Sequence, residues 1–593
     1  MNKTRTGLTA LAVVLCAACT TQQLQHSSAD IQKPLPEGGS GYVEQAGVLS
    51  KKFMASTANP LATETAYQIL KSGGSAVDAA IAAQMVLNLV EPQASGIGGG
   101  AFLLYFDGHA VKAFDGRETA PASATEKLFQ GVDGKPMQFY DGVVGGRSTG
   151  VPGVLRMLEA AHKQYGRSTW AALFAPAIKL ADEGFPVSPR LHTLLQSEKY
   201  LKNDAVAAAY FYDKDGNPKP VGYMLKNPAF ARALREIAAA GADAFYKGRI
   251  AQDIEKKVNS HAANPGGLTV ADIAAYQAKI REPICTDYKQ WSVCGVPPPS
   301  SGGVTVAEIL GILETKDINR FAPDNGILNA NGVHLFSEAG RLAYADRGRY
   351  VADPDFVPFR IKSLVDKEYL AGRAALISDK SMGVARFGLP AAVNVAWGVD
   401  TSPEFAGTSH LSIVDAAGNA VAMTSSIEDA FGSRQMVDGF LLNNQLTDFS
   451  FDSVDENGAI ANRVQAGKRP RSAMAPTFVF DKKTGKLLLV IGSPGGSAII
   501  NYVAKVLIGM MDWGLNVQQA ISLPNFGSRN GPTELEQGRV ADVLVDQLKA
   551  KGHNVRLMEL TSGLQGIMLM NVHGDEMWFG GSDPRREGTA KGD

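Results

Sequence analysis

Two short segments near residue 410 constrain the fold more than any other part of the chain. Apolar Leu411 and Ile413 alternate with polar residues, residues 415–419 interrupt the pattern, and alternation resumes over residues 420–424. A period of two is typical of β-strands, so the pattern predicts a hairpin whose turn centres near Ala417. Antiparallel pairing then places residue 408 opposite about residue 426.

The first residues of this hairpin are unusually polar. Thr408 would have two hydroxyl neighbours across the strand pair, Thr424 and Ser426. Threonine is a good strand residue and hydroxyl pairs across strands are common, so a purely structural role explains this stretch when it is taken alone. A functional interpretation needs residues from elsewhere in the chain.

Composition excludes several classes of function. The chain has 593 residues, of which 45% are hydrophobic and 20% charged, as in packed globular proteins of more than one ordinary domain. A net charge of -1 without basic clusters gives no electrostatic basis for binding nucleic acid or anionic lipid. The nine histidines are scattered and no cysteines beyond the first 19 residues have zinc-ligand spacing, so we expect a function without metal or cofactor.

The first residues form an export signal. A basic head, an apolar stretch from Leu8 to Ala18 and small residues before Cys19 are typical of a leader, and the apolar run is too short to span a bilayer. The segment up to Cys19 resembles a bacterial lipobox, although Cys16 stands where leucine is usual. We expect residues 1–18 to be removed and residues 19–41 to be a linker. Cys19 is either lipidated, anchoring the chain to the outer membrane, or part of a protein secreted into the periplasm.

Beyond Cys19, only two cysteines remain outside the leader, Cys285 and Cys294. They flank a short turn between two strand-like runs, and the exported chain would meet an oxidising compartment. A disulfide across this hairpin is one interpretation, and two buried thiols are the other.

Helical and strand patterns alternate along the chain and indicate a mixed α and β fold. Residues 59–92 have helical spacing interrupted at Gly73 and Gly74, and a strand follows a glycine turn near Gly100. Further helical patterns cover residues 153–166, 230–246, 303–314 and 338–351. The glycines at 96–101 precede a strand rather than follow one, which excludes a dinucleotide fingerprint.

Two glycine turns deserve separate interpretation. Residues 492–496 (GSPGG) lie between an apolar strand and a helix start, where unpaired backbone N–H groups suit an oxyanion or a carboxylate, although an ordinary strand-to-helix turn would look the same. Residues 146–150 (GRSTG) match the Gly-x-Ser-x-Gly pattern of serine hydrolases and make Ser148 a rival nucleophile. Pro152 and Gly153 separate this serine from the next helix and count against the rival.

Four polar residues stand in segments that otherwise have the composition of buried chain: Arg117, Gln445, Asp448 and Ser472. Separately, each could belong to a turn or a salt bridge. Together they offer a cation for a carboxylate and acidic or amide acceptors for an ammonium, which are the two needs of an amino-acid substrate.

The order of several motifs resembles one family. "EPQASGIGGGAFLLYF", "VCGVPPPSSGG", "RLAYADRGRY", "GTSHLSIVD", "LLNNQLTDFS", "GSPGGS" and "GGSDPRREG" follow one another over roughly 90% of the chain. This arrangement is similar to the γ-glutamyltranspeptidase (glutathione hydrolase) family of N-terminal-nucleophile hydrolases. The resemblance implies an α+β fold with four layers in the order αββα.

The resemblance also implies self-cleavage of an inactive precursor at the Gly407-Thr408 bond. Residues 42–407 would form a large subunit and residues 408–593 a small subunit, and the two would remain together as a heterodimer. Cleavage would free the α-amine of Thr408, whose reference pKa of about 8 lets it accept the hydroxyl proton near neutral pH. Nucleophile and base would then belong to one residue.

Further roles follow from the resemblance, position by position. Thr424 would assist Thr408 by hydrogen bonding, and the N–H groups of Gly495 and Gly496 would form an oxyanion hole. The substrate α-carboxylate would be bound by Arg117 and Ser472, and its α-amino group by Gln445 and Asp448. The implied reaction transfers a γ-glutamyl group from glutathione or a related amide to Thr408, and then to water, an amino acid or a peptide.

Two positions depart from the family pattern. Ala473 stands where a second serine is usual, and Glu428 stands where asparagine is common. Losing one hydroxyl costs about 0.5–1.5 kcal/mol, so carboxylate binding should weaken without being lost. Glu428 adds a carboxylate near the expected ammonium pocket. Some relatives are glutaryl or cephalosporin acylases, and this activity stays open as an alternative, as does a non-catalytic envelope lipoprotein.

Overall fold

The computed structural model describes residues 38–391, 397–402 and 407–593. The leader, Cys19 and most of the expected linker lie outside these residues. The described residues belong to one compact unit that spans residues 34–593. None of their helices combines the length and apolar character that a membrane crossing requires.

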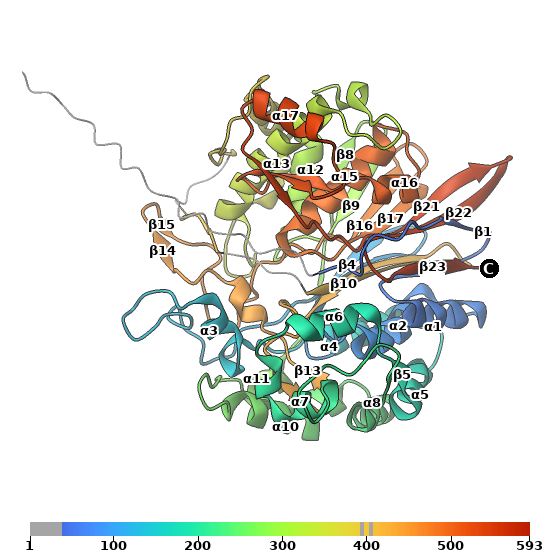
Figure 1. The fold of residues 1–593 in the computed structure, drawn as a ribbon, viewed down its shortest axis with the longest axis vertical. Coiled ribbons are helices and arrows are strands. Elements are labelled where there is room, and N and C mark those ends of the chain that lie inside the picture. The colour runs from blue at the N-terminus through green and yellow to red at the C-terminus, as the bar shows by residue number, and fades with distance from the viewer. Residues whose placement is uncertain (1–37, 392–396, 403–406) are drawn as a thin grey trace, which may run out of the picture. The chain divides into compact units, whose positions relative to one another are not determined.

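Two seven-stranded sheets form the centre of this unit (Figure 1). The sheet that contains the expected hairpin, called here the hairpin sheet, has the order β23-β2-β10-β11-β3-β4-β7. Its strands are β2 (Met54–Thr57), β3 (Gly100–Phe106), β4 (Val111–Gly116), β7 (Lys279–Arg281), β10 (Thr408–Val414), β11 (Ala420–Ser426) and β23 (Thr589–Gly592).

The second sheet, called here the glycine-turn sheet, has the order β1-β22-β21-β17-β16-β9-β8. Its strands are β1 (Val48–Ser50), β8 (Ile284–Tyr288), β9 (Trp291–Gly295), β16 (Thr477–Asp481), β17 (Leu487–Gly492), β21 (Gln565–Val572) and β22 (Asp575–Ser582). All pairings within the two sheets are antiparallel. Each sheet takes strands from both sides of residue 407, so neither side could bury its strands alone.

Helices cover the outer face of each sheet, and Figure 1 shows the strands between the two helical groups. The hairpin sheet is covered by α1 (Pro60–Lys71), α2 (Ala76–Val90) and α4 (Val154–Tyr165), with α5 (Ala175–Glu183) and α8 (Pro228–Ala240) packed beyond. The glycine-turn sheet is covered by α12 (Gly302–Leu313), α15 (Ile499–Met511) and α16 (Val517–Ser522), with α13 (Ala330–Tyr350), α14 (Lys367–Ala374) and α17 (Asp542–Ala550) in the same helical group. The expected αββα layers are therefore present.

Local sequence explains where the first helices begin and end. Asn59 caps α1 by accepting from the N–H of Leu61, and Gly73 adopts a positive φ of 90° just after the helix ends. Ser75 and Asp78 then form a capping box at the start of α2. The interruption expected at Gly73 and Gly74 is thus a pair of helix boundaries.

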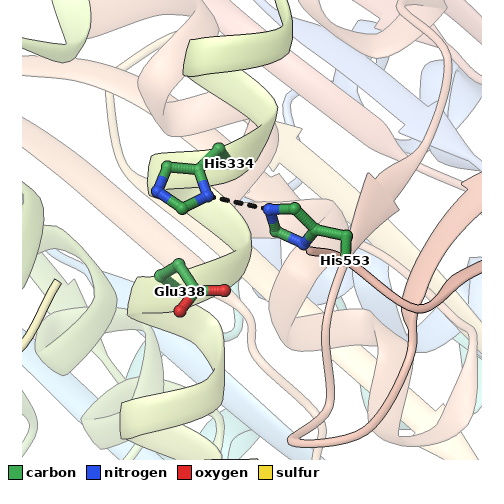
Figure 2. A group of neighbouring side chains, drawn as sticks. All are labelled: His334, Glu338 and His553. Carbon is green, nitrogen blue, oxygen red and sulfur yellow. Dashed lines mark hydrogen bonds between the residues drawn. The ribbon is translucent and has the colours of Figure 1, made fainter. Parts of the chain in front are cut away.

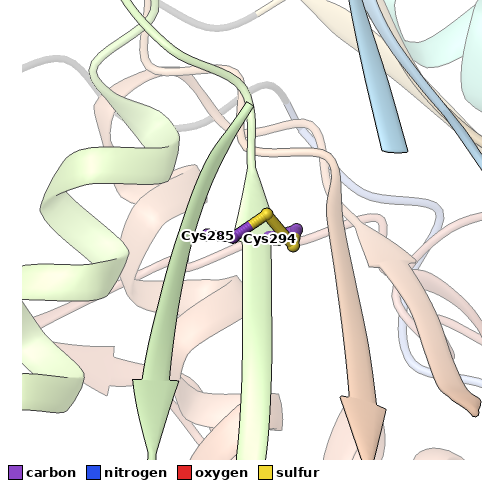
Figure 3. Close-up of a disulfide and its surroundings, with 2 residues drawn as sticks. All are labelled: Cys285 and Cys294. Carbon is purple, nitrogen blue, oxygen red and sulfur yellow. A yellow bond between two sulfur atoms is a disulfide. The ribbon is translucent and has the colours of Figure 1, made fainter. Parts of the chain in front are cut away.

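The two cysteines face each other across the β8–β9 hairpin at the edge of the glycine-turn sheet. Cys285 and Cys294 are joined by a disulfide with an S–S distance of 2.05 Å (Figure 3). Of the two interpretations that the sequence leaves open, the structure has the disulfide.

Candidate active site

The β10–β11 hairpin has the register that the sequence predicts, with Thr408 opposite Ser426. Leu411 and Ile413 pack in the same hydrophobic cluster as α1 and α2. On the opposite face, the Ser412 hydroxyl donates to the carbonyl of Gln565 in β21 at 2.9 Å. Thr408, His410 and Ser412 therefore share the face toward the space between the two sheets, and Thr408 stands at the end of the strand.

The Thr408 hydroxyl belongs to a short chain of hydrogen bonds at the expected cleavage site. It donates to Ser426 Oγ at 3.3 Å, and Ser426 Oγ donates to the carbonyl oxygen of Gly407 at 2.7 Å. Thr424 instead bonds the His410 ring at 2.8 Å. The expectation that Thr424 would assist Thr408 is therefore wrong for this uncleaved chain. Residue 424 lies opposite residue 410, and Ser426 is the hydroxyl that faces Thr408.

His410 lies next to this chain of hydrogen bonds, but its surroundings do not support an acid-base role. Its ring is fully buried and bonds Thr424 through Nδ1 and Ser412 through Nε2. Burial lowers the pKa of His410 to about 3, so the ring is neutral at physiological pH. A Cβ at Gly492 would lie 2.2 Å from its Cε1 atom, which explains why β17 has glycine at that position.

Thr408 lines a small cavity between the sheets, with a volume of about 20 Å³ in the uncleaved chain. Such a volume holds about one water molecule. The cavity is lined by Arg117, Thr408, Ser426, Glu428, Gln445, Asp448, Ser472, Ala473, Met474, Gly496 and Ile499. Residues separated by more than 350 positions thus meet around one hydroxyl, and most of them are those selected from the sequence.

Opposite charges are already paired inside this cavity. Arg117 Nη2 donates to Asp448 Oδ2 at 2.5 Å, and the Gln445 amide donates to the same oxygen at 2.7 Å. Backbone carbonyls fix the guanidinium further, since Nε donates to Pro470 at 3.1 Å and Nη2 to Arg471 at 2.8 Å. The residues expected to bind a carboxylate and an ammonium therefore contact each other directly.

Glu118 is a buried acid beside this pair that the sequence analysis did not single out. Its side chain is fully buried, and Oε2 lies 3.6 Å from Arg117 Nη1. Burial raises the pKa of Glu118 to about 8, although the neighbouring guanidinium opposes the rise. Within the described ranges, neither Glu118 oxygen nor Arg117 Nη1 has a hydrogen-bond partner. Nothing in the sequence indicates that Glu118 is buried, because an acidic residue next to Arg117 resembles an ordinary surface ion pair.

Both departures from the family pattern lie at the cavity. Glu428 adopts a positive φ of 80°, and its carboxylate accepts a hydrogen bond from the Asn444 amide. Ser472 Oγ accepts from the N–H of Met474 at 3.1 Å, while Ala473 contributes a methyl group to the lining. Glu428 is thus a buried carboxylate that is bonded to an amide and lies next to the expected ammonium pocket.

The glycine turn after β17 lies at the same cavity. Gly495 and Gly496 have positive φ values of 135° and 56°, and Gly496 lines the cavity. A Cβ at Gly495 would lie 2.6 Å from the Tyr502 ring, so conformation and space both require glycine there. In the described part of the chain, the N–H groups of these two glycines have no acceptor, which is the state that an oxyanion-binding turn needs.

The rival nucleophile Ser148 has a structural role. Its hydroxyl is buried and donates to the carbonyl of Val143 at 2.6 Å. The GRSTG motif forms a 3-10 turn rather than a strand-to-helix elbow. Ser148 is therefore not placed as a nucleophile.

One cluster of possible metal ligands was missed because its members are far apart in sequence. Among the described residues, His334 and Glu338 on α13 meet His553, and Figure 2 shows the two rings in contact. His334 Nδ1 lies 2.8 Å from His553 Nε2, and His334 Nε2 lies 2.7 Å from the carbonyl of Ser378.

The hydrogen bonds of this cluster run in one direction. Arg341 donates to Thr533 Oγ1 at 2.6 Å, which leaves the threonine proton for His553 Nδ1 at 2.7 Å. His553 Nε2 then donates to His334 Nδ1, and His334 Nε2 to a carbonyl. Glu338 accepts from Arg341 Nε at 2.9 Å. Burial lowers the pKa of both histidines, to about 4 for His553. The ring nitrogens of both histidines and the carboxylate of Glu338 are all bonded to other protein groups, so these residues do not fit a metal ion.

Comparisons with known proteins identify the family. The family model described as gamma-glutamyltranspeptidase matches residues 62–593. The glutathione hydrolase proenzyme of Escherichia coli (strain K12) is 37% identical, and the alignment covers 97% of each chain. The acylase ACY 1 proenzyme of Pseudomonas sp. (strain SE83) is 32% identical over 90% of this chain and 93% of its own.

A solved structure is also similar over almost the whole length. The cephalosporin acylase from Bacillus halodurans superposes with a TM-score of 0.80 at 26% identity, covering 94% of this chain and 99% of that one. The likeness thus extends to relatives that are named for two different activities. On the extent of the family match, this chain is an enzyme of the γ-glutamyltranspeptidase family of N-terminal-nucleophile hydrolases.

Proposed function

We propose that the chain is a self-processing amidohydrolase and transferase that cleaves the γ-glutamyl bond of glutathione and related compounds through an ester on Thr408. The observation that carries the proposal is the cavity in which Thr408 meets Arg117, Gln445 and Asp448. A γ-glutamyl donor presents a carboxylate and an ammonium on one carbon atom. The cavity offers a cation and a carboxylate to match them.

Maturation would begin with the hydrogen bonds at Gly407. The Ser426 hydroxyl polarises the Gly407 carbonyl and would stabilise the charge that develops on its oxygen. The Thr408 oxygen adds to that carbonyl carbon, the C–N bond breaks as the nitrogen takes a proton, and an ester results. Water then hydrolyses the ester, which leaves a carboxylate on Gly407 and a free α-amine on Thr408.

The two products would stay together. In the hairpin sheet, β10 pairs with β2 and β11 pairs with β3, so strands of the small subunit lie between strands of the large one. Several relatives are named proenzymes, which supports a heterodimer made from one precursor. Substrate entry would follow cleavage, because a cavity of about 20 Å³ cannot admit a γ-glutamyl group while the chain continues through Gly407.

Donor binding would exchange one ion pair for two. The substrate α-carboxylate would bind Arg117 and Ser472, and its ammonium would bind Asp448 and Gln445, with Glu428 nearby. The substrate carboxylate would take the place of Asp448 beside Arg117, and its ammonium would take the place of Arg117 beside Asp448. Each protein charge would therefore keep an opposite charge as its partner.

Catalysis would then use the terminal residue as nucleophile and base. The α-amine of Thr408 takes the hydroxyl proton, the oxygen attacks the γ-carbonyl, and the N–H groups of Gly495 and Gly496 stabilise the oxyanion. The proton passes to the departing amine and a γ-glutamyl ester remains. Water releases glutamate from this ester, or an amino acid or peptide takes the acyl group.

Denaturing gels test the self-processing step. We expect wild-type protein to give two bands, one for the fragment that ends at Gly407 and one for the fragment that begins at Thr408. Thr408→Ala should give a single band. A wild-type chain that stays in one piece would contradict self-processing.

A cephalosporin or glutaryl acylase is the second candidate function, because relatives with acylase names match most of the chain. The test is the ratio of kcat/KM for a γ-glutamyl anilide to that for the matching glutaryl anilide, with Thr408→Ala as the blank. A site that hydrogen-bonds the amine should reject the group that lacks it, by up to about 10⁴-fold. A ratio at or below one would favour the acylase, and no turnover of either would favour a non-catalytic lipoprotein.

We also propose export to the periplasm, with Cys19 lipidated and the protein attached to the outer membrane. The basic head, apolar run and small residues before Cys19 support this. Labelling with a radioactive fatty acid should mark the wild type and leave Cys19→Ser unlabelled. Label on neither protein would favour plain secretion.

A further inference from the structure

Helix α13 contacts the glycine turn directly. The Tyr344 hydroxyl donates to the carbonyl of Ser497, the residue that follows Gly496. At the same residue, Arg529 Nη1 donates to the Ser497 hydroxyl at 2.9 Å. Glycines with positive φ give a turn little stiffness of its own, so these two contacts on Ser497 help to hold the adjacent Gly496 in place.

The same helix reaches a second residue of the cavity lining one turn later. Arg347 Nε donates to Ser301 Oγ at 2.7 Å. Ser301 donates to the carbonyl of Ser472 twice, from its backbone N–H at 2.7 Å and from its hydroxyl at 2.6 Å. The side chain of Arg347 therefore acts on Ser472 through Ser301.

Both contacts come from one face of a buried helix. Residues three apart lie on the same side of an α-helix, and Tyr344 and Arg347 are 6% and 5% exposed. Ser472 and Gly496, the residues that they reach, both line the cavity at Thr408. One rigid element thus sets the separation between two walls of the site.

We propose that Tyr344 and Arg347 are positioning residues, which fix the oxyanion-binding turn and the Ser472 wall relative to Thr408. The inference rests on the proposed function, which assigns oxyanion binding to the glycine turn and carboxylate binding to Ser472. The oxyanion exists only during the reaction, whereas the substrate carboxylate is bound throughout. Loosening the turn should therefore lower kcat, and loosening Ser472 should raise KM.

The test compares three substitutions on a γ-glutamyl anilide: Tyr344→Phe, Ser301→Ala and the control Tyr350→Phe. Tyr350 is on the same helix, is equally buried, and donates to the carbonyl of Gly388 at 2.7 Å, away from the cavity lining. Tyr350→Phe therefore removes the same kind of hydrogen bond as Tyr344→Phe, from a tyrosine hydroxyl to a carbonyl, without changing a residue that contacts the site. Melting temperature and self-cleavage are measured on every variant.

Tyr344→Phe should lower kcat about 10-fold with KM unchanged, which is about 1.4 kcal/mol at tenfold per 1.36 kcal/mol. Ser301→Ala should raise KM by about 3- to 10-fold with kcat retained, the loss expected for one hydrogen bond. Tyr350→Phe should lower the melting temperature as much as Tyr344→Phe does and leave both kinetic constants alone.

Three results would overturn the inference. The first is equal kinetic loss in the two tyrosine variants, which would indicate general destabilisation. The second is an active wild type whose Tyr344→Phe variant has unchanged kcat, which leaves the proposed function intact. The third is a wild type that turns over no anilide, which refutes the proposed function together with the inference. Self-cleavage should persist in Tyr344→Phe, because its oxyanion forms at Ser426 rather than at the glycine turn.

Discussion

Replacing Glu118 by glutamine should change how stability depends on pH. Glu118 is fully buried, and burial raises its pKa from 4.5 to about 8. Below pH 4.5 the carboxyl is protonated in both folded and unfolded chains, and its contribution to stability is fully present. Between about 4.5 and 8 the unfolded chain loses this proton first, so stability falls as pH rises. Above about 8 the folded chain also ionises and the fall ends.

The size of the effect follows from the same pKa values. An interval from 4.5 to about 8, at about 1.36 kcal/mol for each pH unit, corresponds to roughly 5 kcal/mol. Glutamine has a similar volume and no charge to lose. E118Q should therefore gain stability relative to the parent by up to about 5 kcal/mol between pH 5 and pH 9.

Denaturant unfolding between pH 5 and pH 9 measures this difference. Both chains carry Thr408→Ala, which keeps them in one piece and allows refolding. Other buried acids titrate equally in the two proteins, so the difference between their unfolding free energies isolates residue 118. A difference that does not change with pH would mean that Glu118 is ionised and paired with Arg117, and would refute the argument from burial.

Three further experiments test separate parts of the structure. Ser426→Ala should slow self-cleavage by about 10²-fold or more, the usual cost of removing an oxyanion donor, and Thr424→Ala should slow it far less; gel time courses separate the two. Replacing Cys285 and Cys294 by serine should lower the unfolding free energy by about 2.7 kcal/mol for a loop with a sequence separation of 9, measured with and without reductant. Ser148→Ala should keep activity in the anilide assay and lower the melting temperature, because the Val143 carbonyl loses its hydrogen-bond donor. If Ser148→Ala lost activity and Thr408→Ala remained active, the protein would be a serine hydrolase.

The sequence was sufficient to predict local structure where short-range rules determine it. The period of two and the five-residue interruption fix the register of the β10–β11 hairpin, because a slip of one residue would turn Leu411 and Ile413 away from their helices. The same holds for α1 and α2, whose boundaries follow from Gly73 and a capping box. Polar character and family resemblance placed Arg117 and Asp448 in one site, but neither predicted their direct contact, since 331 residues separate them in the sequence.

Two features lay beyond pattern reasoning for physical reasons. Thr424 and Ser426 share one strand face, so only the exact cross-strand partner decides which hydroxyl meets Thr408. The His334–His553 contact joins residues 219 positions apart, and its meaning depends on hydrogen-bond direction, which Arg341 and Thr533 determine. Periodicity predicts faces, whereas these outcomes depend on individual atoms.

The Arg117–Asp448 pair also bears on which acyl group the site accepts. A glutaryl group would draw the guanidinium away from Asp448 without returning a positive charge, whereas a γ-glutamyl group returns one in its ammonium. Separating a buried ion pair without replacing a partner is strongly unfavourable, because it leaves an uncompensated charge. Glu428 also lines this cavity and would add a second carboxylate there, which would increase that difference. The Arg117–Asp448 pair thus supports the proposed preference for γ-glutamyl donors over glutaryl ones, which the ratio of kcat/KM for the two anilides tests.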